Sequence, residues 1–251
     1  MMTKTHLPAL SRAQTYAAAQ LLAEQYGIAP LQTLEHAGRS LAEVAKGMLD
    51  GDLADRPIVV LAGLGYNGSG GLVAARHLLN WGAWVQVLCT HATEQYTGIP
   101  AQLLRTLQTM GAPLAWAEEG WELPPCDLVI DAIMGVGLQG EPQGKARDLI
   151  QLANSSVAPI LSLDVPSGVD ADSGAWATPH VVAAATLALA LPKQGMLVDD
   201  ARRACGELYL ADLGVPLCLY ADLGVEVEPF FGRDPIVRWD VEDGIARMVD
   251  E

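Results

Sequence analysis

Basic residues are scarce in this sequence of 251 amino acids, where 15 Lys and Arg stand against 30 Asp and Glu and give a formal net charge of -15. Binding to nucleic acid or to an anionic membrane surface needs a basic face, so we expect neither partner. Long apolar runs are missing too: the longest, residues 181–192, is well short of the about 20 residues that cross a bilayer. The first residues do not predict export, and we expect a cytoplasmic protein.

Cysteine is also rare. The four cysteines, Cys89, Cys126, Cys205 and Cys218, are too widely spaced to form a metal-binding pair. They are too few in a chain of this length for a disulfide framework, so we expect free thiols in a reducing compartment. Hydrophobic residues, in contrast, make up 51% of the sequence, which is ample for a buried core.

Short apolar segments alternate with helix-like stretches along most of the chain. Two helical stretches, residues 11–27 and 31–49, come first, and Ser11 is a typical first cap. Continuous Val, Ile and Leu runs indicate strands buried on both faces of a parallel sheet. We therefore predict one α/β domain over residues 1–225, a doubly wound, mostly parallel, Rossmann-like sheet in three αβα layers. Residues 226–251 form an acidic extension, either packed or a partly ordered tail. The predicted strands are "PIVVLAG", "WVQVLC", "PLAWAE", "DLVIDAI", "PILSLDV", "ATLALAL" and "GELYLADLG".

A glycine-rich stretch, "GLGYNGSGG" at residues 63–71, joins the first of these strands to an amphipathic helix. Gly63, Gly65 and Gly68 match G-x-G-x-x-G in its proper context, which predicts a loop whose amides hold a phosphate or pyrophosphate. A tight turn without a ligand is the alternative. The acidic residue that holds the adenine ribose in dehydrogenases is missing from "WVQVLCTH", so an ordinary nicotinamide oxidoreductase is disfavoured.

Polar residues follow three further strands. Asp131 ends one strand, Asp164 and Ser167 follow the next, and Lys193 follows a third. The carboxyl ends of parallel strands meet at one edge of a sheet, so we expect these residues to share a site with the glycine-rich stretch. Lys193 either contacts a phosphate or is a solvated loop lysine.

Four blocks in register resemble the YjeF N-terminal domain family, whose members include the NAD(P)HX epimerases. The blocks are "GLGYNGSGG" with "LVAARHL", "DAIMGVGLQGE", "LSLDVPSGVDADSG", and "LALPKQGMLVDD" with "GELYLADLGVP", and the resemblance spans roughly residues 8–220. It implies a Rossmann-like homodimer that interconverts the epimers of hydrated NADH and NADPH, which carry a hydroxyl at C6 of the nicotinamide ring. It also implies a potassium ion on Asn67, Asp131 and Ser167. The implied substrate residues are Tyr66, Asn67, Gly68, Ser69, Gly70, Gly135, Val136, Gly137, Leu138, Gln139, Gly140, Glu141 and Asp164, and Lys193 joins them as a candidate phosphate contact.

Asp164 is the candidate catalytic residue. We expect it, in protonated form or through a water that it positions, to protonate the departing C6 hydroxyl, and water then adds to the other face of the ring. The alternative is that Asp164 only bonds the amides of a turn.

Within the glycine-rich stretch this chain departs from the family pattern. Leu64 replaces a Pro, Tyr66 an Asn, Ser69 a Gly and Gly70 an Asp. We predict an active epimerase, with a catalytically inactive member that binds a nucleotide metabolite or a partner protein as the alternative.

Overall fold

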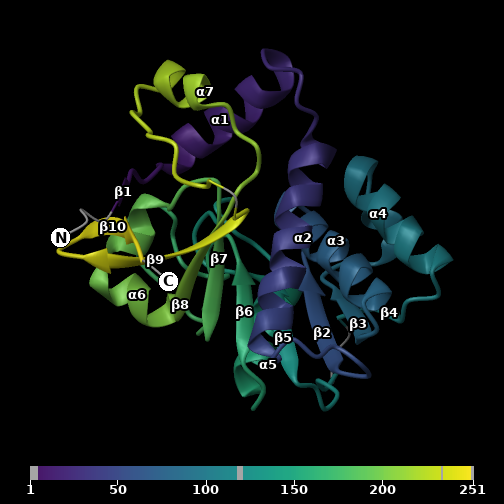
Figure 1. Ribbon diagram of the computed structural model, residues 1–251. Coiled ribbons are helices and arrows are strands. Elements are labelled where there is room, and N and C mark those ends of the chain that lie inside the picture. Colours follow the sequence, from purple (N-terminus) through teal and green to yellow (C-terminus); the bar gives the residue numbers. More distant parts are fainter. Residues whose placement is uncertain (1–4, 118–120, 233, 250–251) are drawn as a thin grey trace.

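The computed structural model describes residues 5–117, 121–232 and 234–249. Its core is one sheet of ten strands in the order β1-β10-β9-β8-β7-β6-β5-β2-β3-β4 (Figure 1). In the order of the sheet, β8, β7, β6, β5, β2, β3 and β4 pair in parallel. Strands β8, β9, β10 and β1 pair antiparallel. The strands are β1 His6–Leu7, β2 Pro57–Ala62, β3 Trp84–Cys89, β4 Leu114–Trp116, β5 Leu128–Ala132, β6 Ile160–Leu163, β7 Ala185–Leu189, β8 Glu207–Ala211, β9 Ile236–Glu242 and β10 Ile245–Met248.

Helices cover both faces of the sheet, as Figure 1 shows. Successive side chains of β2 point to opposite faces of the sheet. Val60 packs in the core under α2, α3 and α4, whereas Leu61 packs in the core under α5. This arrangement confirms the predicted α/β fold with a single, mostly parallel sheet. The helices are α1 Arg12–Glu24, α2 Pro30–Met48, α3 Tyr66–Asn80, α4 Gly98–Thr109, α5 Gly144–Ser155, α6 Asp199–Cys205 and α7 Leu217–Asp222, with 3-10 turns η1 Thr93–Gln95 and η2 Gln194–Leu197.

Helix α1 begins where the sequence predicts. Ser11 and Gln14 form a capping box, in which the Gln14 amide N–H donates to Ser11 Oγ over 3.2 Å and Ser11 N–H donates to Gln14 Oε1 over 3.0 Å. Two N–H groups that the helix itself cannot satisfy are thereby paired. The C-terminal end of α1 lies against α7, where the Tyr26 hydroxyl donates to Asp222 over 2.9 Å.

The C-terminal segment adds an antiparallel edge to the sheet. Strands β9 and β10 form a hairpin beside β8, and the two-residue β1, which the sequence did not predict, pairs with β10. Trp239 on β9 is buried and donates its indole N–H to Tyr209 O over 3.1 Å. The described part of the segment after residue 225 is therefore packed, whereas residues 233, 250 and 251, like 1–4 and 118–120, lie outside the described residues.

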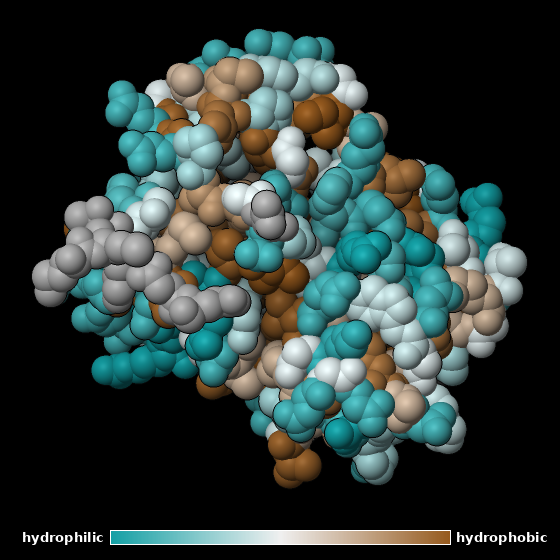
Figure 2. All heavy atoms as spheres, viewed as in Figure 1, coloured by the Kyte–Doolittle hydropathy of each residue, from teal (hydrophilic) through white to brown (hydrophobic). Residues whose placement is uncertain are grey.

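The strand order reverses between β2 and β5. From β2 the chain moves to β3 and β4 on one side, and from β5 it moves to β6, β7 and β8 on the other. A crevice for ligands forms at such a switch point, outside the carboxyl ends of the strands. Within the described residues no helix has both the length and the apolar character needed to span a membrane. Figure 2 shows hydrophilic side chains along the exposed face of α2 and hydrophobic ones beside it over the middle of the sheet.

Candidate functional site

The carboxylate of Asp131 is completely buried at the end of β5. Ser167 Oγ donates to its Oδ1 over 2.6 Å, while Ser167 N–H and Ser162 Oγ donate to Oδ2 over 2.9 and 2.8 Å. Burial raises the pKa of Asp131, and the donated hydrogen bonds oppose that rise. Among the described residues no ion pair includes Asp131. The site thus holds a carboxylate surrounded by dipoles rather than by a positive side chain.

Asn67 and Asp164 approach the same backbone segment. A Cβ atom placed on Gly135 would lie 3.1 Å from Asn67 Oδ1 and 3.2 Å from Asp164 Oδ2. Ser167 joins them, because its Oγ accepts a hydrogen bond of 3.0 Å from the amide of Met134. The segments that follow β5 and β6 and the start of α3 therefore meet around residues 134–135, which brings Asn67, Asp164 and Ser167 together.

This cluster has the chemistry of a site for a monovalent cation. Asn67 Nδ2 is buried with no hydrogen-bond partner among the described residues, and as a donor it calls for an acceptor that the protein does not supply. The atom of this side chain that can ligate a cation is the amide oxygen, Oδ1. No group of three or more His, Cys, Asp or Glu side chains within the described residues is placed to hold a metal ion. A set with one carboxylate, one amide, one hydroxyl and nearby carbonyls fits a hard, singly charged cation that exchanges its hydration shell for oxygen atoms.

Lys193 is buried and forms an ion pair with Asp164 Oδ1. The side chain of Lys193 is 1% exposed, and its ammonium also donates to Leu189 O over 2.8 Å and to Leu191 O over 3.1 Å. Three acceptors match its three hydrogens, so the reading of Lys193 as a solvated loop lysine is wrong. The predicted contact with a phosphate has no free donor here, and the influence of Lys193 on the site passes through Asp164.

The backbone of Asp164 has a conformation that residues other than glycine rarely adopt. Its φ of 70° places it in the left-handed region, while its amide donates to Leu187 O over 2.7 Å. Such strain persists only where the surroundings hold it, and it gathers at functional sites. The ion pair with Lys193 and the packing of β6 against β7 supply that hold.

The glycine-rich stretch is mostly helical rather than a loop through residue 71. Helix α3 starts at Tyr66, so Tyr66, Asn67, Gly68, Ser69 and Gly70 form its first turns, with Gly65 as an N-cap that lacks a side-chain hydrogen bond. Tyr66 is exposed, whereas Ser69 is buried and donates its hydroxyl to Gly65 O over 3.2 Å.

Close backbone packing explains three of these glycines. A Cβ atom on Gly63 would lie 1.9 Å from Ile133 O, one on Gly68 would lie 1.9 Å from Gly63 O, and one on Gly71 would lie 2.5 Å from Ala132 Cβ. The strand-to-helix turn must press against β5, which leaves no room for side chains. The tight-turn alternative therefore accounts for Gly63, Gly68 and Gly71, while the exposed N-terminus of α3 keeps its free amides.

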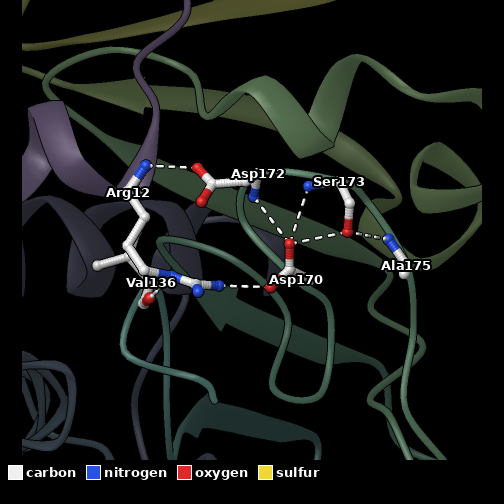
Figure 3. Close-up of polar contacts among 6 residues, drawn as sticks. All are labelled: Arg12, Val136, Asp170, Asp172, Ser173 and Ala175. Atoms are coloured by element: carbon white, nitrogen blue, oxygen red, sulfur yellow. Dashed lines mark hydrogen bonds and ion pairs between the residues drawn. The ribbon is translucent and has the colours of Figure 1, made fainter. Parts of the chain in front are cut away.

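The segment from Gly135 to Glu141 is held by Arg12, which sequence reasoning missed. Figure 3 shows the Arg12 guanidinium between two loops, where it donates through Nε to Val136 O over 2.8 Å and pairs with Asp170. Asp170 Oδ1 also accepts from the amides of Asp172 and Ser173, which fixes the turn that follows Asp170. Of the predicted substrate residues here, Gly135 and Leu138 are buried, Val136 is half-buried, and Gly137, Gln139, Gly140 and Glu141 are exposed at the rim.

Comparison with known proteins identifies the family. A family model described as YjeF-related protein N-terminus matches residues 30–195. The chain belongs to this family. It is 39% identical over 230 residues to a Truepera radiovictrix protein named NAD(P)H-hydrate epimerase, with 91% of this chain and 99% of that protein covered. A Dehalogenimonas lykanthroporepellens protein of the same name is 38% identical over 209 residues and covers 82% of each chain.

A solved member shares the fold. The crystal structure of the yeast protein ynu0 matches with a TM-score of 0.76 and 25% identity, over 92% of this chain and all of the yeast one. The family identity and the structural match agree with the resemblance that the four sequence blocks carry.

Proposed function

We propose that this protein is an NAD(P)H-hydrate epimerase, which interconverts the R and S epimers of hydrated NADH and NADPH. The observation that carries the proposal is the convergence of Asp164, Asn67 and Ser167 around residues 134–135. Relatives with the name NAD(P)H-hydrate epimerase match this chain over most of their own length. The buried carboxylate, the amide and the free helix N-terminus are the groups that such a substrate needs: an acid–base group, an orienting group and an anion site.

Epimerisation requires that the C6 hydroxyl leaves from one face and returns to the other. The lone pair of the ring nitrogen forms a C=N bond as the C6–O bond breaks, and the leaving hydroxyl takes one proton and departs as water. Water then adds to the opposite face and releases one proton, so that only the configuration at C6 has changed. Asp164 carries these proton transfers, directly or through a water that it positions, and its ion pair with Lys193 fixes the place of its carboxyl group.

The same proposal places a potassium ion on Asn67, Asp131 and Ser167. When bound, it supplies a fixed positive charge that offsets the buried carboxylate of Asp131 and part of the charge of the dinucleotide. Thermal unfolding in potassium chloride against choline chloride tests this apart from activity. The expected result is a potassium-dependent rise in Tm that Ser167→Ala and Asn67→Leu both reduce, and an equal Tm in the two salts contradicts the site.

The substrate contacts follow from the same arrangement. The pyrophosphate lies at the N-terminus of α3, next to Tyr66, and the nicotinamide half lies beside residues 135–141 and Asp164. A homodimer in the cytoplasm completes the proposal. The four free cysteines support a reducing compartment, and sedimentation equilibrium tests the dimer.

The deciding experiment starts from one purified epimer of hydrated NADPH. The protein is added in potassium buffer, and the isomer ratio is followed by chromatography against a protein-free control. The expected result is equilibration much faster than in buffer alone. Binding of the epimer without faster interconversion supports the inactive member instead, for which the substitutions at Tyr66 and Gly70 are the specific argument.

A further inference from the structure

A cavity opens next to the proposed catalytic groups. This crevice has a volume of about 660 Å³ and lies among the ends of β2, β3 and β4 and the segment between β5 and α5. Ile133 and Met134 line it, and the following residue, Gly135, abuts Asn67 and Asp164. The crevice therefore adjoins the proposed nicotinamide site and shares its central backbone segment. Its most informative lining residues are Leu64, Thr90, His91, Gln95, Trp116 and Lys145.

The position suits one end of an extended ligand. Asp164 follows β6 and Thr90 follows β3, and three strand spacings separate these strands in the sheet, which is about 14 Å. Between them lie the end of β2 and the N-terminus of α3, the proposed place of the pyrophosphate. A dinucleotide bound with its nicotinamide at Asp164 would thus reach this crevice with its other nucleoside.

The lining has the chemistry of a nucleoside site. Trp116, at the end of β4, is 45% exposed, and Leu64 is also exposed, so both offer apolar surface to a planar base. Thr90, His91 and Gln95 offer polar groups, and the Thr90 hydroxyl lies 2.8 Å from His91 Nδ1. Lys145, in the first turn of α5, supplies a positive charge that Asp148 partly offsets, since its Nζ lies 3.6 Å from Asp148 Oδ2.

We propose that this crevice binds the adenylate half of the hydrated dinucleotide, with the adenine against Trp116 and a phosphate near Lys145. The inference rests on the proposed function, because that function supplies the dinucleotide. The volume falls within the roughly 300–1,000 Å³ of small-molecule sites. None of Trp116, His91 and Lys145 belongs to the residues that the family resemblance implies.

ADP-ribose is the probe that isolates this inference, since it carries the adenylate half and lacks the nicotinamide. Its affinity for the full chain is measured by calorimetry, without any turnover. Trp116→Ala is expected to weaken binding about 5- to 150-fold, the usual effect of losing one base–aromatic stack, and Trp116→Phe is expected to retain most of the affinity. Lys145→Gln is expected to weaken binding several-fold, and more at low than at high salt.

Trp84→Ala is the matched control. Trp84 is 67% exposed at the opposite end of β3, so its removal should leave ADP-ribose affinity unchanged. Unchanged binding in Trp116→Ala, or no binding of ADP-ribose to the wild type, overturns the inference. A protein that binds ADP-ribose through Trp116 yet does not epimerise hydrated NADPH would refute the proposed function while the crevice assignment stands. An active epimerase whose affinity for ADP-ribose does not depend on Trp116 would refute the crevice assignment while the proposed function stands.

Discussion

The buried pair of Lys193 and Asp164 makes a prediction about stability that is independent of activity. Lys193→Met keeps the length and the apolar part of the side chain but removes the charge. It leaves Asp164, which is 6% exposed, without its counter-charge, and it frees the carbonyls of Leu189 and Leu191. Removal of one partner of a buried pair costs about 3–5 kcal/mol, a large share of the roughly 5–15 kcal/mol that stabilises a typical domain.

Urea unfolding at pH 7, followed by circular dichroism and by tryptophan fluorescence, measures this loss. The double variant Lys193→Met/Asp164→Asn should be more stable than the sum of the two single losses predicts, with a coupling of about 1–3 kcal/mol. Arg203→Met is the control: Arg203 is 75% exposed and lies 3.8 Å from Asp200, so its loss should change stability by less than about 0.5 kcal/mol. A Lys193→Met variant within 1 kcal/mol of the wild type, or strict additivity in the cycle, would refute the reasoning.

Three further outcomes are expected. Gly38→Ala should lower the free energy of unfolding by about 1–3 kcal/mol, because its Cβ would lie 2.4 Å from Val73 Cβ. Gly47→Ala on the same helix α2 has no atom within 4 Å of its Cβ and should be neutral or stabilising. Equal effects of the two variants in urea unfolding would contradict the α2–α3 packing. Partial burial raises the pKa of Asp170, but the hydrogen bonds from the Ser173 amide and from Arg12 outweigh it and lower the pKa to about 2. Asp170 therefore stabilises the fold above the unfolded pKa of about 3.9, and this contribution is lost as the pH falls toward 2. The stability difference between wild type and Asp170→Asn should therefore shrink from pH 5 to pH 2, and a constant difference would count against the pairing. Arg12→Met should speed hydrogen exchange in residues 135–141, because Val136 loses its guanidinium donor; unchanged exchange there would show that Arg12 does not hold this segment.

The sequence predicted much of the fold because its signals are local. Continuous apolar runs between helical stretches identified the strands from β2 to β8, and Ser11 marked the start of α1. A topological rule placed Asp131, Asp164 and Ser167 at one rim, since Asp131 ends one parallel strand and the other two follow the next. Their meeting around residues 134–135 follows from that rule together with the strand order.

The remaining features depend on contacts that no local pattern contains. Arg12 reaches Val136 and Asp170, which are 124 and 158 positions away in the sequence. Lys193 follows Pro192 in a connection, where a lysine is ordinarily solvated, and only the fold of residues 189–191 buries it against Asp164. The glycine-rich stretch predicted a loop, because glycine is a poor helix former. Close packing of Gly68 on Gly63 and of Gly71 on Ala132 of β5 outweighed that propensity.

The central claim is that Asp164 converts a bound dinucleotide hydrate from one epimer to the other. The most direct measurement is the rate at which a single purified epimer of hydrated NADPH equilibrates with wild type and with Asp164→Asn, both in potassium buffer and both checked for folding by circular dichroism. The account predicts rapid equilibration with the wild type and a rate at least about 100-fold lower with Asp164→Asn, the usual weight of an acid–base group. Equal rates for the two proteins, or a wild type no faster than buffer, would contradict it.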